Sequence, residues 1–261
     1  VAFKRFKKAY SIFQYRYLDW STKYAVRNTS KIIVPSGATK EDLQSFYGCP
    51  AGKIEVIEHG FEESVVGDFD AFEKSDVLKY FGLNKKTKYI LFVGRLETKK
   101  NLERLVLAFE KFSKKHKDYK LVLAGGRGVG FQKILDAVTK KNLADKVFMP
   151  GYVNEDEKAT LMKYCKVFAF PSLYEGFGLP ILEAFYYEKP VLSSNSSAIM
   201  EVAGDAALLV DPLNVSKMAE GLCRLVDEPV CARDFVKLGK ARLKKFSWKK
   251  AAKKTLAVLR G

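Results

Sequence analysis

The sequence is poor in the residues that build disulfide frameworks and zinc sites. Its 261 residues include two histidines and four cysteines, and no two cysteines form a C-x-x-C pair. No cysteine is spaced from His59 or His116 as zinc ligands usually are, so neither kind of site is predicted. Unpaired thiols are typical of a reducing compartment, and we therefore expect a cytoplasmic protein.

Long apolar runs are missing as well. A charged residue or a proline interrupts each apolar stretch before it reaches the roughly 18 residues that span a bilayer. The basic start also lacks the apolar core of a signal peptide. A transmembrane or secreted protein is therefore not expected, although a hydrophobic content of 48% is enough to fill a core.

Acidic residues are scarce at the two ends of the chain, and the net charge of +16 arises there. Residues 1–27 contain seven Lys/Arg and one acid, residues 233–261 contain eleven and one, and the middle is neutral. Such a surplus favours nucleic acid, anionic lipid or anionic small molecules as partners. Because the middle is neutral and no nucleic-acid-binding motif is present, nucleic acid is not an expected partner.

Aromatic residues recur every three or four positions at the start of the chain. They are Phe3, Phe6, Tyr10, Phe13, Tyr17, Trp20 and Tyr24. This spacing predicts one stripe along a single helix. The favoured interpretation is that the stripe packs on its own domain. In the alternative interpretation, the aromatic stripe and the nearby lysines rest on an anionic membrane surface. The protein would then be peripheral on the inner face of the membrane.

Short apolar segments rich in Val, Ile, Leu and Phe alternate with helical patterns along most of the chain. Apolar strands without polar alternation are expected in a parallel sheet that helices cover on both faces. We therefore predict an α/β fold with a doubly wound, Rossmann-like parallel sheet over residues 71–232. Residues 1–70 form a smaller region with a βα unit, and residues 233–261 are expected to form a basic, amphipathic C-terminal helix.

Loops that follow the strands carry ligands in such sheets. The glycine run GGRGVG at 125–130 does not fit the G-x-G-x-x-G register of nicotinamide enzymes, and no Gly-Lys-Ser/Thr follows any glycine run. These glycines serve close backbone approach or ligand contact, and the two are equally favoured. Asp68 and Asp70 form a D-x-D pair, but no strand precedes it, so we do not expect it to hold a metal-bound nucleotide.

The segment EGFGLPILE points most directly to a function. Pro180 suits the first position of a helix, where the preceding amides point outward and bind phosphate. Glu175 precedes the turn and Glu183 lies about one turn inside the helix, so the two carboxylates address different parts of one ligand. Arg95 and Lys100 follow another strand of the same sheet. Together they predict a cradle for a diphosphate, flanked by carboxylates that bind hydroxyl groups.

From about residue 30 to 225 the chain resembles the retaining GT-B glycosyltransferases of family four, which include bacterial mannosyltransferases. Three features carry the resemblance: the E-x7-E pattern from Glu175 to Glu183, the G-R-x4-K-N pattern from Gly94 to Asn101, and the run SNSSAIMEVAGDAALLVDP. The resemblance implies a C-terminal GT-B domain plus a remnant of the N-terminal Rossmann domain. It also implies that most of that acceptor-binding domain is missing.

The resemblance further implies roles for individual residues. Arg95 and Lys100 would grip the diphosphate, and Glu175 would bind hydroxyls of the donor sugar, which makes these three the catalytic candidates. The donor-binding candidates are Gly94 in the G-R motif, Val153 and Lys158 at the base, the amides of Phe177, Gly178 and Leu179 at the distal phosphate and sugar, and Glu183 at the ribose. His59-Gly60 replaces the Asn-Gly that is common in the family.

The implied activity moves a sugar from a nucleoside-diphosphate sugar to a hydroxyl acceptor, a glycan or a lipid-linked glycan, with retention. GDP-mannose is the favoured donor. No cofactor or metal is expected, because Arg95 and Lys100 supply positive charge to the diphosphate. Three alternatives stay open: a nucleotide-sugar-binding fragment without turnover, one chain of a transferase whose N-terminal domain is a separate chain, and a basic protein that binds nucleic acid in a salt-dependent way.

Overall fold

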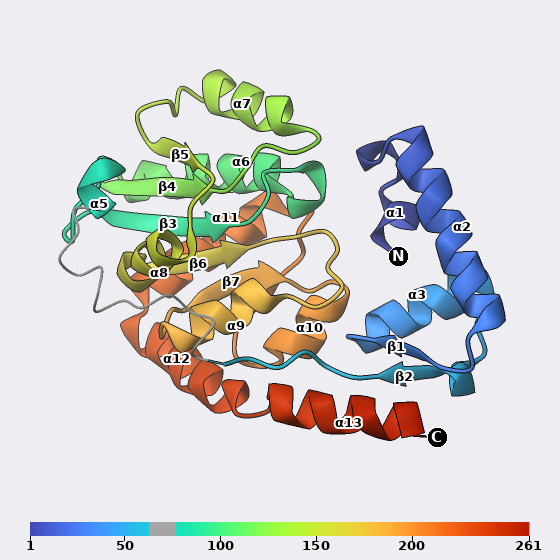
Figure 1. The fold of residues 1–261 in the computed structure, drawn as a ribbon. Coiled ribbons are helices and arrows are strands. Elements are labelled where there is room, and N and C mark those ends of the chain that lie inside the picture. The colour runs from blue at the N-terminus through green and yellow to red at the C-terminus, as the bar shows by residue number, and fades with distance from the viewer. Residues whose placement is uncertain (63–76, 261) are drawn as a thin grey trace.

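The computed structural model describes residues 1–62 and 77–260 of the chain (Figure 1). The D-x-D pair of Asp68 and Asp70 lies outside these residues. Two sheets organise the described chain. The smaller one pairs β1 (Ile32–Val34) with β2 (Ile54–Val56) in parallel, and the larger one has six strands.

The larger sheet has the strand order β5-β4-β3-β6-β7-β8, and each neighbouring pair is parallel. Its strands are β3 (Lys88–Val93), β4 (Tyr119–Ala124), β5 (Val147–Gly151), β6 (Val167–Phe170), β7 (Val191–Ser194) and β8 (Leu208–Val210). From β3 the chain winds first toward one edge and then, through β6, toward the other. This is the doubly wound Rossmann order, and the predicted α/β fold class is confirmed.

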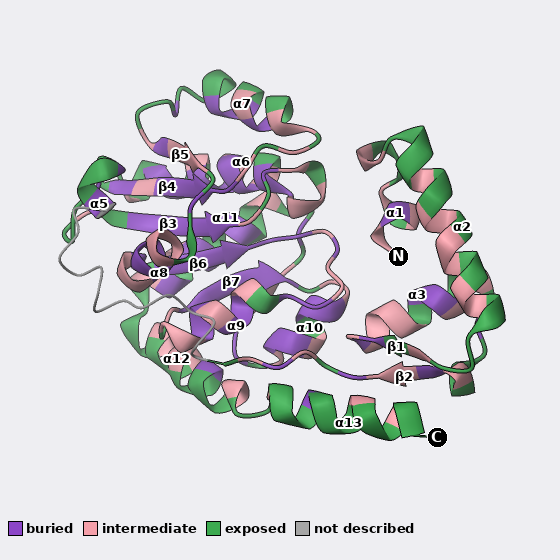
Figure 2. Cartoon of the chain, viewed as in Figure 1, coloured by how far each residue is buried: buried purple, intermediate pink, exposed green. Residues whose placement is uncertain are grey.

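Helices cover both faces of this sheet (Figure 1). One face carries α6 (Leu102–Lys115), which packs against α11 (Val215–Asp227), and the other carries α8 (Glu155–Tyr164) and α9 (Leu179–Tyr186). Three further helices, α5 (Val77–Tyr80), α7 (Phe131–Lys140) and α10 (Ala198–Ala203), belong to the same part. The central strands are accordingly almost wholly buried (Figure 2), which explains their continuous apolar sequence.

The aromatic stripe at the start of the chain does not lie on one helix, so that prediction is wrong. The chain forms α1 (Ala2–Arg5), a short 3-10 turn and then α2 (Ile12–Asn28). Ser11 begins α2 with a capping box, in which its side chain accepts from the Gln14 amide and the Gln14 side chain accepts from the Ser11 amide. This local cap ends the run of helical periodicity.

The two halves of the stripe have different surroundings. Phe3 is buried and meets the rings of Tyr10 and Tyr15 edge-on. The four residues of the stripe that lie on α2, in contrast, are 59–84% exposed: Phe13, Tyr17, Trp20 and Tyr24. The favoured interpretation, in which the whole stripe packs on its own domain, is therefore wrong for α2.

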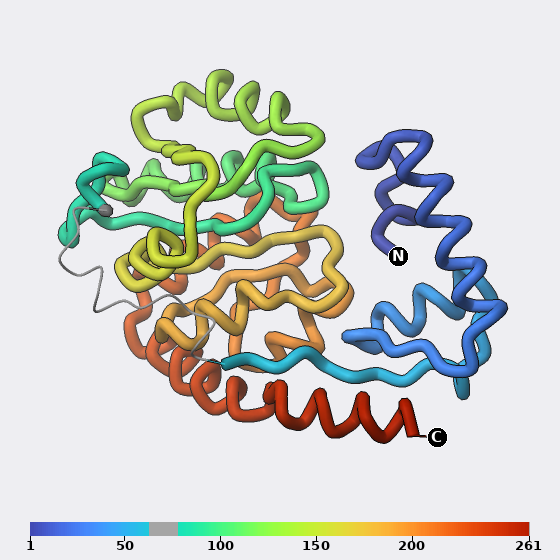
Figure 3. Tube along the Cα trace, viewed as in Figure 1, coloured from blue at the N-terminus to red at the C-terminus, as the bar shows by residue number. Residues whose placement is uncertain are grey.

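The smaller sheet is covered by α3 (Gly37–Tyr47), and its own small core contains Val34, Leu43, Cys49 and Ile54. After β2 the chain runs along the large domain and beside the start of α13 (Figure 3). This strand-like passage places residues 57–62 against the edge of the larger part.

The C-terminal region forms two helices rather than the predicted one, α12 (Pro229–Leu243) and α13 (Trp248–Arg260). The helix breaks because Phe246 turns inward, where it is 4% exposed and meets the Phe177 ring edge-on. The exposed side of α13 is rich in lysine, as expected. No helix in the described part of the chain is both long and apolar enough to cross a membrane.

Candidate functional site

At their carboxyl ends β3 and β6 lie side by side, but the loops that follow them lead toward opposite edges of the sheet. We call the region at this switch point the crevice. In doubly wound sheets this switch point is where ligands bind. The loop after β3 contains Gly94 to Asn101, and the loop after β6 leads to α9. A backbone hydrogen bond of 2.8 Å from the Leu173 amide to the Lys99 carbonyl ties the two loops together.

Lys100 and Glu175 meet across this crevice. The Lys100 ammonium lies 2.5 Å from Glu175 Oε1, and the side chains are only 13% and 12% exposed. The same ammonium is 5.0 Å from the centre of the Phe170 ring. The sequence predicts separate roles for Lys100 and Glu175, whereas the structure joins them in one shielded ion pair.

Lys158 and Glu183 form a second pair nearby on α8 and α9. Their charged atoms are 2.9 Å apart, and Lys158 also contacts Glu155 at 2.5 Å. Burial alone would lower the pKa of Lys158, but the charges of Glu183 and Glu155 outweigh it and raise that pKa. Val153, the other residue predicted at the base pocket, is buried at the end of the loop that precedes α8.

The N-terminus of α9 lies between Glu175 and Glu183 in the sequence and carries the predicted phosphate-binding amides. Gly178 adopts a φ of 127° directly before the helix, a conformation that favours glycine. Pro180 occupies the second helical position, one residue later than predicted. Amides at the start of a helix have no acceptor within it, so those around Phe177, Gly178 and Leu179 are suited to an anionic ligand.

The glycine run after β4 supports the loop that contains Arg95. The amide of Leu96 donates to the Gly126 carbonyl, and the amide of Gly128 donates to the Leu96 carbonyl, both at 2.9 Å. A Cβ atom at Gly125 would lie 2.0 Å from the Gly94 carbonyl oxygen. Of the two roles considered for the run, the structure shows the close backbone approach. Arg95 itself is exposed, and its side chain lies over Gly128.

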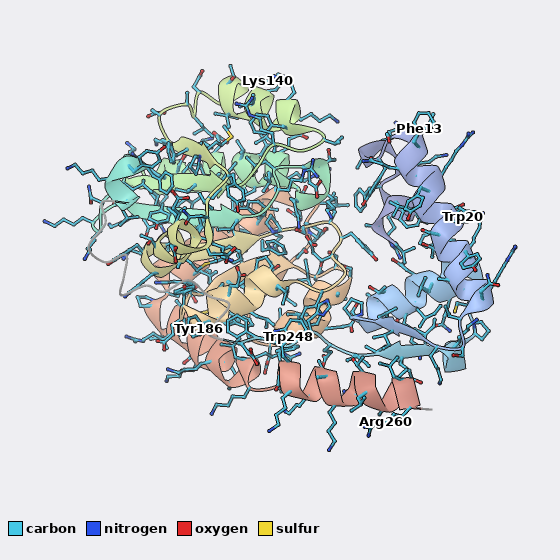
Figure 4. The ribbon with its side chains drawn as sticks, viewed as in Figure 1. Phe13, Trp20, Lys140, Tyr186, Trp248 and Arg260 are labelled. Atoms are coloured by element: carbon cyan, nitrogen blue, oxygen red, sulfur yellow. The ribbon has the colours of Figure 1, made fainter. Side chains whose placement is uncertain are left out.

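His59 belongs to the passage beside α13 and lies close to the α9 turn. Its ring centre is 5.0 Å from that of Phe177 and 5.7 Å from that of Trp248. Burial lowers the pKa of His59, which favours the neutral imidazole. Figure 4 labels Trp248 at the start of α13.

Several residues that support the site are absent from the sequence-based prediction. Ser197 accepts a hydrogen bond from the Glu175 amide at 3.0 Å, and the Ser36 hydroxyl donates to the Gly176 carbonyl at 2.8 Å. Glu201 on α10 accepts from the amides of Gly37 and Ala38, each at 2.7 Å. The run SNSSAIME contains two of these residues, but partners up to 164 positions apart leave no local signal.

Between α3 and α10 these contacts border a cavity of about 580 Å³. Its lining includes Arg5 and Asp42 from the N-terminal part and Tyr174 from the loop after β6. Asp42 is almost completely buried, and it accepts from Arg5 and from the Tyr174 hydroxyl. The smaller part of the protein therefore touches the loop that positions Glu175.

The fold is a doubly wound domain, and the groups at its switch point are suited to a phosphate ligand. Two family models agree with this class: glycosyl transferases group 1 matches residues 74–242, and glycosyltransferase family 4 matches residues 2–65. The first model covers more than half of the chain. The chain therefore belongs to the glycosyl transferases group 1 family, and the resemblance to family four is confirmed.

Individual relatives are similar over most of this chain. O-antigen chain mannosyltransferase B of Escherichia coli is 27% identical over 242 residues, which are 92% of this chain and 63% of that protein. Sucrose-phosphate synthase from Thermosynechococcus elongatus has 26% identity and a TM-score of 0.77, over 91% of this chain and 59% of that one. Anabaena HepE, solved with UDP and glucose, has 19% identity and a TM-score of 0.79. The match covers 94% of this chain and 66% of the HepE chain.

These structures confirm the GT-B type of fold. The chain spans 54–63% of the length of the first three curated relatives.

Proposed function

We propose that this protein transfers a sugar from a nucleoside-diphosphate sugar to a hydroxyl acceptor. The observation that carries the proposal is the pairing of Lys100 with Glu175 and of Lys158 with Glu183 beside the N-terminus of α9. A ligand in this crevice meets cations, helix amides and carboxylates together. These are the groups that a diphosphate linked to two polyhydroxylated units requires.

The chemistry follows from where charge develops. Transfer breaks the bond between the sugar C1 and a phosphate oxygen, and negative charge grows on the leaving diphosphate. Arg95, Lys100 and the amides before α9 stabilise that charge, and removing one such preorganised donor typically costs about 10²- to 10³-fold in rate. Glu175 then holds hydroxyls of the sugar, and Glu183 holds those of the ribose.

We propose further that the reaction retains the anomeric configuration and needs neither a metal nor a cofactor. The positive charge of Arg95 and Lys100 supports metal independence. The similarity to a mannosyltransferase supports GDP-mannose as donor, and a glycan or a lipid-linked glycan as acceptor. Val153 and Lys158 would contact the base.

The direct test measures sugar transfer from GDP-mannose and from UDP-glucose, with and without EDTA. We expect Glu175→Ala to abolish transfer, whereas Glu188→Ala should leave it unchanged, because Glu188 is half exposed and paired with Lys240 away from the crevice.

Arg95→Ala should weaken binding of the nucleoside diphosphate more than that of the nucleoside, as measured by calorimetry. Transfer that EDTA stops would contradict the metal-independent mechanism.

A second candidate function is binding of the nucleotide sugar without turnover by this chain alone. The chain matches 54–63% of the length of the first three curated relatives, and acceptor contacts can lie in the part that is not matched. A domain that supplies them could be added as a second chain. Hydrolysis and transfer would be measured for this chain alone and after adding such a domain. If this chain alone binds the nucleotide sugar without turnover, and adding the N-terminal domain restores sugar transfer, the two form a two-chain enzyme.

We propose as well that α2 attaches the protein to an anionic membrane surface on the cytoplasmic side. Phe13 and Trp20 lie along α2, remote from the six-stranded sheet (Figure 4). Three exposed cations, Arg16, Lys23 and Arg27, each follow one of the exposed aromatic residues of α2 by three positions and so lie beside them. Aromatic rings beside Lys/Arg are typical of helices that lie in a membrane interface.

Vesicle flotation tests this attachment. The protein should float with vesicles rich in phosphatidylglycerol and not with pure phosphatidylcholine. Trp20→Ser should reduce flotation, and Tyr152→Ser should not, because Tyr152 is 81% exposed but lies after β5. Equal flotation of both variants would exclude α2 as the attachment surface.

A further inference from the structure

A second cluster of reactive side chains lies far from the crevice. The helix α6 starts directly after the Lys100 loop and has 14 residues, so its ends are about 21 Å apart at 1.5 Å per residue. His116 follows its last residue, at the end remote from the crevice. There α6 packs against α11, which contains Cys223 and Asp227.

Three ligand-type atoms converge at this point. One atom each of His116, Cys223 and Asp227 lies within 4.8 Å of the other two. Cys223 and Asp227 are four positions apart, which places them one turn apart on the same face of α11. The end of α6 supplies the imidazole from the opposite side.

The imidazole and the carboxylate are already oriented. The His116 ring stacks on Phe112 with a centre distance of 4.5 Å and meets Tyr119 edge-on at 5.6 Å. Its Nε2 is 3.2 Å from Asp227 Oδ1, yet this buried atom has no partner in hydrogen-bond geometry. Lys115 binds the other oxygen, Oδ2, at 2.7 Å and so leaves Oδ1 directed toward the imidazole.

We propose that His116, Cys223 and Asp227 form a binding site for a divalent cation of the zinc class. Imidazole nitrogen, thiolate sulfur and carboxylate oxygen are ligands that Zn²⁺ takes. Tetrahedral Zn²⁺ ligands are about 3.3–3.7 Å apart, as follows from its bond lengths. The three side chains therefore need to close by about 1 Å. Cys223 and Asp227 are not buried, which leaves them room to do so.

The surroundings of the site fit this proposal. Cys223 and Asp227 line a groove of about 520 Å³ between α6 and α11, where water can complete the coordination. The cations around the groove have partners of their own, since Lys111 binds Ser216 and Arg224 binds Glu228. A bound ion would join the end of α6 to α11. Its role is to stabilise this side of the sheet rather than to act in the crevice.

The linear sequence hides this site. The spacing between His116 and Cys223 exceeds 100 residues, and neither residue stands in a metal-binding motif. Only the packing of α6 on α11 brings the ligands together. The absence of a zinc motif therefore excludes a local zinc module but not a site between two helices.

Cobalt titration of the full chain tests the site, because Co²⁺ bound to a thiolate gives a charge-transfer band. We expect saturation at one Co²⁺ per chain and displacement by Zn²⁺. Cys223→Ser and Cys223→Ala should lose the band, and His116→Gln should weaken Co²⁺ binding at least tenfold. Zn²⁺ at about 100 times its Kd should raise Tm by about 5 °C in the original chain and not in Cys223→Ser.

Cys231→Ser is the matched control, since Cys231 is another partly exposed thiol, on the neighbouring α12. It should keep the band and the Zn²⁺-dependent rise in Tm. Circular dichroism identifies any variant that fails to fold, and Asp227→Asn then provides a second ligand change. A band that survives Cys223→Ser, or no band at saturating Co²⁺, would overturn the proposal and leave an ordinary contact between His116 and Asp227.

Discussion

Lys100 and Glu175 neutralise each other in a crevice that shields both from water. A buried charge that loses its partner destabilises the folded state more than the pair itself stabilises it. Each residue should therefore depend on the other. The pair acts on stability as one unit, in addition to its proposed roles toward the ligand.

A double-mutant cycle measures this dependence. We expect Lys100→Ala and Glu175→Ala each to lower the free energy of unfolding by about 1–3 kcal/mol. The double variant should lose less than the sum, with a coupling of at least about 0.5 kcal/mol. Urea unfolding of the original chain, the two single variants and the double variant gives the four free energies of unfolding. Strict additivity would show that the ion pair contributes nothing.

His59 makes stability depend on pH. Burial lowers its pKa from the ordinary value of 6.5, so the folded chain binds this proton less readily than the unfolded chain. The contribution is complete above about pH 6.5 and is lost as the pH falls through the lower folded pKa. We expect Tm to decrease from pH 7 to pH 5, and to decrease less in His59→Asn. Parallel Tm curves for both proteins would exclude His59 as the cause.

At the scale of elements, the passage after β2 and the start of α13 approach each other closely. A Cβ atom at Gly60 would lie 2.0 Å from the Trp248 amide nitrogen. We therefore expect Gly60→Ala to displace α13 and to lower the free energy of unfolding by about 1–3 kcal/mol. Chemical denaturation gives this change.

Gly52→Ala is the control for this substitution. A Cβ at Gly52 has no heavy atom within 4 Å, and its backbone is not in the left-handed region. Gly52→Ala should change the free energy of unfolding by less than about 0.5 kcal/mol. Equal effects of both substitutions would mean that the contact with Trp248 is unimportant.

Apolar patterning predicted the elements of the large sheet well, because buried parallel strands need continuous apolar residues. It failed where one side chain changes the path of the backbone. Ser11 caps a new helix in the middle of the aromatic stripe, and Phe246 turns inward and divides the C-terminal helix. Both events depend on one or two residues, which an average over a helical window does not detect.

The candidate site shows the same limit. Motif spacing placed Glu175, Glu183, Arg95 and Lys100 near one sheet edge, because loops after parallel strands share that edge. It did not predict that Lys100 pairs with Glu175, 75 positions away. Pairing depends on the rotation of side chains within the fold, and no pattern along the chain records it.

At the scale of the whole molecule, Glu201 on α10 links the part that contains the six-stranded sheet to α3 of the smaller part. Its carboxylate binds two amides at the N-terminus of α3, as a capping side chain does. Glu201→Ala should lower the free energy of unfolding by about 1–2 kcal/mol and loosen the N-terminal part. Limited proteolysis should then cleave α3 faster. Glu220→Ala, which removes an exposed pair with Lys217, is the control and should behave as the original chain.

The charge of the molecule is concentrated at its two ends, whereas acids and cations are matched inside the crevice. A simple anion such as sulfate can compete for Lys100, but it offers no donor to Glu175, which would be left unsatisfied. A ligand with both a phosphate and neighbouring hydroxyls satisfies the two partners at once. If the crevice binds a nucleotide sugar as proposed, bare anions should bind weakly because they satisfy Lys100 alone. Inorganic phosphate should therefore be a poor inhibitor of sugar transfer.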